Sequence, residues 1–93
     1  MILEIVSPEA TLLHSEVDII SVPGVNGEFQ MLNNHAPIVS ILQKGLVKIT
    51  APSFKFSKES EDLFAKVNDQ NYTIAIQSGT IEMKDNKVIV LAD

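Results

Sequence analysis

Hydrophobic residues recur at every second position in short runs along this chain, and polar or turn-forming residues separate the runs. A period of two is typical of half-buried β-strands, whose side chains point alternately to the two faces of a sheet. Apolar residues at helical spacing are nearly absent. The pattern therefore predicts an all-β protein, with strands expected over 2–6, from Thr11 onward, and over 17–22, 28–31, 38–42, 46–50, 72–77, 80–83 and 88–91.

Turn residues lie between these runs at short intervals. The strongest signal is Pro23-Gly24-Val25-Asn26-Gly27, which predicts a hairpin connection. A tight turn is expected at 43–45, and short connectors at 78–79 and 84–87. Strands this short need two layers to bury their apolar faces. We therefore expect a two-layer β-sandwich or flattened barrel of about eight to ten short strands.

The segment from Ala51 to Asn71 departs from the pattern because it is polar and charged. Ser57 followed by acidic residues is typical of a helix start, and Leu63 and Val67 would then lie one turn apart. Leu63, Ala65 and Val67 also alternate with polar residues, as in an extended hairpin arm. A short helix and an extended arm both stay open for this segment.

Length, charge and cysteine content narrow the function classes. The 93 residues are one domain's length, and the net charge of -5 with a pI of about 4.8 predicts no nucleic-acid partner. The seven basic residues are scattered, so no direct lipid insertion is expected. No stretch has the pattern of a signal peptide or a membrane span. We expect a protein of the compartment in which it is made.

The sequence predicts no catalytic, metal or cofactor site. His14, His35 and Asp18 supply residue types of a catalytic triad, but Gln77-Ser78-Gly79 lacks the first glycine of a nucleophile elbow. Two distant histidines without cysteine are a weak metal pattern, and the isolated glycines form no phosphate-binding loop. His14 is expected on a solvent-facing strand position. The chain is thus not expected to be an enzyme by itself.

One stretch combines turn glycines, apolar residues and polar tips, namely 27–37. Loops on a rigid sandwich commonly carry binding sites. The alternative is that two turns flank one core strand.

This stretch carries a family resemblance. Residues 19–29, Asn34-His35-Ala36-Pro37 and Gly45 resemble the signature of the F-type ATP synthase epsilon subunit, in which a Gly-Glu turn precedes a Gly-His-Ala-Pro element and a second glycine follows the next strand. The first strand and turn at 3–9, and the closing strands at 77–82 and 88–93, are similar to the family as well. The resemblance covers most of the chain outside 51–71 and implies the N-terminal β-sandwich domain of that subunit.

Three features differ from the family pattern. Asn34 replaces a common glycine, although asparagine also tolerates positive φ. The polar insertion after Thr50 is longer than usual. Family members continue past the Leu-Ala-Asp point into two C-terminal helices that carry inhibition and, in some, ATP sensing, whereas this sequence stops at Asp93. We expect a single domain over 1–93 with no C-terminal helical domain, and an adaptor role without the regulatory one.

The resemblance implies a non-catalytic rotor subunit in the central stalk of a proton-translocating F-type ATP synthase, at the cytoplasmic face of the bacterial inner membrane. It would link the gamma subunit to the membrane c-ring and couple ion flow to ATP synthesis. Carried over by position, Asn26, Gly27 and Glu28 are expected to contact the c-ring, where an acidic turn suits basic loops. The candidates for the gamma contact are His35, Ala36, Pro37 and Leu42, of which Ala36 or Leu42 can also be core.

Two other function classes are kept as alternatives. A free-standing β-sandwich that binds a ligand such as a carbohydrate would need exposed aromatic side chains, and the chain has only Tyr72 and four phenylalanines, of which Phe29 is expected inside. A small hydrolase around His35 is the third class. An activity screen of the isolated domain would separate it from the other two.

Overall fold

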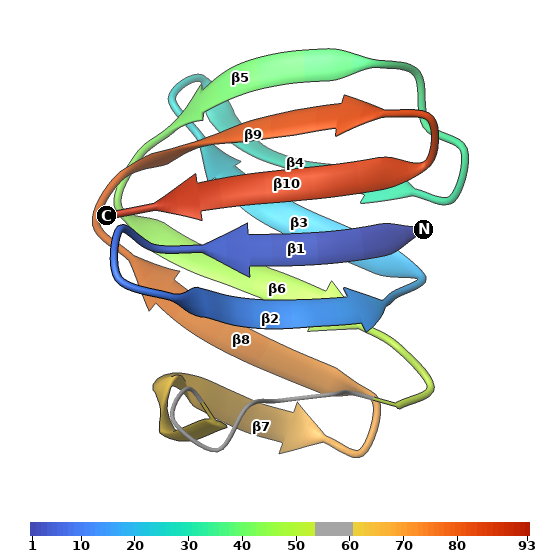
Figure 1. Cartoon of the computed structure of the whole chain (residues 1–93), viewed down its shortest axis with the longest axis vertical. Coiled ribbons are helices and arrows are strands. Elements are labelled where there is room, and N and C mark those ends of the chain that lie inside the picture. The colour runs from blue at the N-terminus through green and yellow to red at the C-terminus, as the bar shows by residue number, and fades with distance from the viewer. Residues whose placement is uncertain (54–60) are drawn as a thin grey trace.

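The computed structural model describes residues 1–53 and 61–93 and contains ten β-strands in one strongly curled sheet (Figure 1). The all-β prediction of a sandwich or flattened barrel of eight to ten strands is therefore confirmed. The strands are β1 (Ile2–Val6), β2 (Thr11–Glu16), β3 (Ile19–Gly24), β4 (Gly27–Leu32), β5 (Ile38–Leu42), β6 (Gly45–Thr50), β7 (Phe64–Asn68), β8 (Asn71–Ile76), β9 (Gly79–Lys84) and β10 (Lys87–Ala92).

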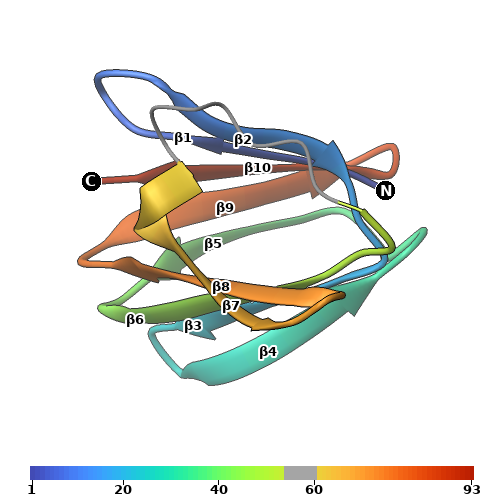
Figure 2. The same cartoon turned by 90° about the horizontal axis from the view of Figure 1, so that it is seen from below.

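The sheet folds into two layers that face each other (Figure 2). One layer has the order β2-β1-β10-β9-β5, and the other has the order β3-β6-β8-β7 with β4 on the free side of β3. A single pair, Gly24 with Leu42, joins β3 to β5 and thus connects the layers. The β1 and β10 strands pair in parallel, while the neighbouring β9–β10 and β1–β2 pairs are antiparallel.

The core lies between the layers and consists of the inward-facing residues of each strand. The alternation seen in the sequence places these side chains on one face, as in β1, where Leu3 and Ile5 are fully buried between half-buried neighbours. Burial of this apolar surface is the main stabilising contribution. The largest fully buried side chains are Leu3, Ile5, Leu13, Ile20, Met31, Leu42, Ile49, Ile81, Met83, Val17, Val22 and Val47.

The connection between β5 and β6 is a tight turn, as predicted, but the two strands that it joins do not form a hairpin. The strands β5 and β6 do not pair with each other. Both pair with β3, β6 along Ile19–Ser21 and β5 at Gly24, while β4 pairs with the other edge of β3. The amide of Gln43 instead donates a hydrogen bond to the carbonyl oxygen of Pro23, at 2.8 Å. Turn residues fix the length of a connection, whereas the pairing partner depends on long-range packing that the local sequence does not contain.

After Ser53 the chain is described again from Glu61 onward, so the predicted helix start at Ser57 lies outside the described residues. A 3-10 turn at Glu61–Leu63 leads directly into β7, which pairs with β8. Phe64 is buried opposite Ile74 and anchors this strand to the core. The extended-arm alternative is therefore confirmed for 64–68. In the ranges 1–53 and 61–93, no helix has the length and apolar character needed to cross a membrane.

Candidate partner surfaces

The predicted hairpin connects β3 to β4 through a loop of Val25 and Asn26. Gly24 and Gly27 pair across its base, and both loop residues are exposed. Gly27 has a φ of 121°, a conformation that glycine adopts without strain and other residues rarely adopt. A Cβ at Gly24 would lie 2.8 Å from the ring of Phe29, so there is no room for a side chain at Gly24. The two glycines together produce a narrow, projecting tip.

Glu28 follows this tip and forms an ion pair with Lys48 of β6. Its Oε1 lies 3.0 Å from the Lys48 Nζ, and the two side chains are 50% and 53% exposed. Glu28 was predicted from the sequence as a contact residue, whereas Lys48 was not. Only the strand register brings the two together, because β3 pairs with β4 at Glu28 and with β6 at Lys48.

A hollow of about 290 Å³ lies beside this ion pair. Its apolar part consists of buried Pro23 and Leu46, a leucine that is 47% exposed. Glu28, Lys48 and Gln43 form its polar part. The hollow therefore combines an apolar floor with two opposite charges, a surface suited to a polar protein loop.

The loop with His35, Ala36 and Pro37 lies at the other end of the molecule. All three residues are exposed, and the amide of His35 donates a hydrogen bond to the Leu32 carbonyl oxygen at 3.2 Å. The strand β4 separates this loop from the hairpin tip, a span of about 17 Å for its six residues. The structure thus does not bring the two predicted contact groups together.

Asn34 in this loop has a φ of 63°, so the expectation that asparagine serves here in place of glycine is confirmed. Its backbone amide donates a hydrogen bond to Asn86 Oδ1 at 2.7 Å. Asn86 and Asp85 form the β9–β10 turn with φ values of 60° and 54°. This pair of positive φ angles is the pattern of a type I′ hairpin. The contact fixes the loop relative to the β9–β10 hairpin.

Leu42, the fourth candidate for the gamma contact, is only 2% exposed and belongs to the core. This is the alternative that the sequence left open for it, whereas Ala36 is exposed. The side chains that β5 presents outward are Val39 and Ile41, at 75% and 64% exposure. Alternation predicts two faces for β5 but does not say which one is buried, so these two residues were not predicted as contact residues.

Val39 and Ile41 belong to a larger, partly apolar face, here called the β5–β10 face. Strand pairing aligns Ile41 with Thr80 of β9 and Thr80 with Leu91 of β10, which is 52% exposed. The next row aligns Val39, Glu82 and half-buried Ile89. The polar Thr80 and Glu82 of β9 thus lie between the apolar side chains of β5 and β10. Exposed apolar residues gathered on one face are typical of protein–protein contacts.

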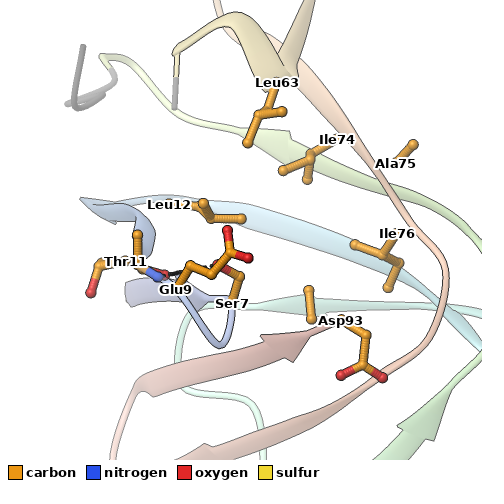
Figure 3. Close-up of a pocket in the computed structure, with 11 residues that line it drawn as sticks. Ser7, Glu9, Thr11, Leu12, Leu63, Ile74, Ala75, Ile76 and Asp93 are labelled. Atoms are coloured by element: carbon orange, nitrogen blue, oxygen red, sulfur yellow. Dashed lines mark hydrogen bonds between the residues drawn. The ribbon is translucent and has the colours of Figure 1, made fainter. Parts of the chain in front are cut away.

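A second apolar hollow, of about 550 Å³, opens between the β1–β2 turn and β8 (Figure 3). Leu12 and Ile74 lie on its opposite walls, and Leu63 lies at its edge. Glu9 and Asp93 place carboxylates at its rim, and the Ser78 hydroxyl donates a hydrogen bond to Asp93 Oδ2 at 2.5 Å. No sequence motif indicated this hollow, since it forms from four segments that are distant in the chain.

The described residues form no cluster typical of a metal site. Within 1–53 and 61–93, no group of three or more His, Cys, Asp or Glu residues lies close enough to hold a metal ion. His14 is exposed on β2, as expected, and His35 Nδ1 lies 2.7 Å from the carbonyl oxygen of Ala36. The distinctive features of the molecule are therefore its surfaces.

Sequence comparison identifies the family. The sequence model of the beta-sandwich domain of the ATP synthase delta/epsilon chain matches residues 1–93. The chain belongs to this family. It is 36% identical over 91 residues to the ATP synthase epsilon chain of Desulfitobacterium hafniense strain DSM 10664 / DCB-2, a match that covers 98% of this chain and 57% of that relative. The resemblance seen in the sequence is thereby confirmed.

Other epsilon-type relatives agree with this assignment. The ATP synthase epsilon chain of Dehalococcoides mccartyi strain CBDB1 is 32% identical over 91 residues, covering 98% of this chain and 54% of the relative. The chain thus spans little more than half the length of these curated relatives.

Solved structures share the fold. A chain in the cryo-EM structure of the Euglena gracilis mitochondrial ATP synthase, titled OSCP/F1/c-ring in rotational state 1, superposes with a TM-score of 0.76 at 19% identity, over 99% of this chain and 49% of that chain. A chain in the Tetrahymena thermophila mitochondrial ATP synthase structure, titled central stalk/cring, gives a TM-score of 0.67 at 16% identity, over 99% and 62%. At these identities the similarity shows a common fold.

Proposed function

We propose that this epsilon-type domain is a non-catalytic adaptor in the central stalk of a proton-translocating F-type ATP synthase. It links the gamma subunit to the c-ring and so couples ion flow to ATP synthesis, at the cytoplasmic face of the bacterial inner membrane. The observation that carries the proposal is the family match over residues 1–93, together with two separate partner-type surfaces on one compact sandwich. An adaptor needs two contact surfaces and a stiff body between them.

The c-ring contact is assigned to the tip with Asn26, Gly27 and Glu28. This tip projects from the sandwich and carries a carboxylate directly after the turn. A carboxylate beside an apolar floor suits the basic side chains of a polar loop. The carboxylate accepts hydrogen bonds from the cationic group, and the apolar floor packs against the aliphatic part of the side chain.

The gamma contact is assigned to the loop of His35, Ala36 and Pro37 and to the β5–β10 face. The loop leads directly into β5, so the exposed apolar side chains of Val39 and Ile41 continue from it along the same strand. Burying such side chains in an interface contributes roughly 25 cal/mol for each Å² removed from water. Leu42 supports this surface from inside the core.

The carbohydrate-binding alternative requires aromatic rings that are accessible to a ligand. Of the aromatic residues in the described ranges, Phe64 is buried, and Phe29 and Tyr72 are half-buried and pack against the core. They serve the packing of the sandwich, and this alternative gains no support from them.

Coupling in membrane vesicles tests the proposal. In vesicles from source cells that lack the chain, we expect ATP hydrolysis to pump protons poorly, and added wild-type chain to restore pumping. Glu28→Lys should restore it less well. Glu16→Lys, which makes the same charge change at an exposed position on β2, should act like the wild type. Full pumping without the chain would contradict the adaptor role.

A further inference from the structure

The Glu28 carboxylate is not a free anion, because it forms an ion pair with Lys48. The two side chains belong to strands that are not neighbours: Glu28 on β4 pairs with Pro23, and Lys48 on β6 pairs with Ser21 on the other side of β3. The strands β4 and β6 are therefore about 9 to 10 Å apart. Both side chains reach over β3 to bring Oε1 and Nζ to 3.0 Å.

The adjacent hollow has the shape and chemistry of a site for a basic side chain. Pro23 and Leu46 form an apolar floor, and Glu28 lies at its edge. Arginine and lysine have aliphatic stems that pack on apolar surfaces, while their cationic heads need a carboxylate or water. A partner's basic side chain could thus lay its stem on Leu46 and direct its head to Glu28. It would meet Lys48 at the same carboxylate.

We infer that Lys48 is an internal competitor for the partner's cation at Glu28. This inference rests on the proposed c-ring contact and names a further residue in it. Two cations at one carboxylate repel each other, so the partner gains less from Glu28 while Lys48 stays paired. An exposed ion pair is a weak interaction, and Lys48 can leave it without disturbing the fold. Lys48 therefore keeps the contact reversible and holds the empty site electrically neutral.

Removal of the Lys48 charge should strengthen binding. We expect Lys48→Met to bind purified c-ring from the source organism about two- to fivefold more tightly than the wild type, the range that corresponds to releasing one exposed ion pair. Glu28→Gln should weaken binding, and Lys48→Met should have no further effect in the Glu28→Gln background. Biolayer interferometry with the immobilised 93-residue chain and detergent-solubilised c-ring measures all four proteins.

Salt dependence separates competition from a structural effect. In the wild type one cation replaces another at Glu28, whereas in Lys48→Met a new ion pair forms, so the affinity of the variant should fall more steeply with salt. The control is Lys84→Met, which makes the same change of net charge at the far end of β9 and should leave affinity and salt dependence unchanged. Lys48→Gln provides a second neutral variant if Lys48→Met proves poorly folded in a thermal melt.

Two kinds of negative result are distinguishable. If the wild type binds the ring and Glu28→Gln weakens binding, but neither neutral Lys48 variant binds more tightly, Lys48 is not a competitor and the inference fails alone. Weaker binding by these variants would make Lys48 a direct contact and would also overturn it. If the wild-type chain does not bind the ring, the proposed ring contact fails, and the inference fails with it.

Discussion

Asn34 and Asn86 are 52 positions apart in the sequence, yet the backbone amide of Asn34 donates a 2.7 Å hydrogen bond to Asn86 Oδ1. Both residues have positive φ, at 63° and 60°. The contact ties the loop before β5 to the β9–β10 hairpin. It thereby fixes one end of the proposed gamma surface.

Asn86→Ala should lower the free energy of unfolding by about 1–2 kcal/mol, because it removes this hydrogen bond and places alanine at a positive φ. Asn34→Gly should change it by less than about 0.5 kcal/mol, because glycine keeps the donor and tolerates the φ. Urea unfolding followed by circular dichroism measures both variants. Equal losses for the two would show that the Asn86 side chain has no special role.

Gly79 packs against the backbone of β10, where an added Cβ would overlap the carbonyl oxygen of Leu91. Gly79→Ala should therefore lower the free energy of unfolding by on the order of 3 kcal/mol, since β9 and β10 must shift apart. Thr80→Ala, at the exposed position next to it, should cost less than about 0.5 kcal/mol. Urea unfolding again gives the values. If Gly79→Ala unfolded at the same urea concentration as the wild type, β9 would be able to shift away from β10 without loss of stability.

Leu42 and Ile41 are neighbours in β5 with opposite roles. Leu42→Ala should cost about 2–5 kcal/mol of stability because it opens a cavity in the core. Ile41→Ser should leave the thermal midpoint nearly unchanged, since the side chain is 64% exposed, but should weaken co-purification with gamma. A thermal melt and a gamma pull-down of both variants test this difference. Undiminished gamma binding by Ile41→Ser would remove the β5–β10 face from the proposed interface.

The isolated 93-residue chain should not bind ATP. Its net charge is -5, and its glycines are isolated turn residues that form no phosphate-binding loop. Isothermal titration with Mg-ATP at up to millimolar concentration should give only the heat of dilution. Saturable binding in the micromolar range would show a nucleotide site that neither the sequence nor the described surfaces indicate.

Most of the fold could be predicted from the sequence because its determinants are local. The period-two alternation and the turn residues place nine of the strands, and the Gly24–Gly27 turn predicts its hairpin. The pairing of β5 was not predictable in this way. Gln43 and Gly45 determine a short connection, but β5 and β6 pair with β3 and not with each other because of contacts between distant segments.

The candidate contacts could be predicted only in part. Resemblance pointed to Glu28 and His35, and the structure places both at the surface, at opposite ends of β4. Lys48 could not be found, since its partner is two strands away and 20 positions earlier in the sequence. Leu42 was predicted as a gamma contact but is buried, and its neighbour Ile41 is exposed instead. Alternation alone does not tell which face of β5 meets the core.

The most direct test of the adaptor role is a pull-down of the carboxyl-terminally tagged chain from a lysate of its source cells, with the retained proteins identified by mass spectrometry. We predict recovery of the gamma and c subunits together with other subunits of the rotary ATP synthase. Recovery of none of them, by a folded chain from a lysate that contains the intact complex, would contradict the adaptor role.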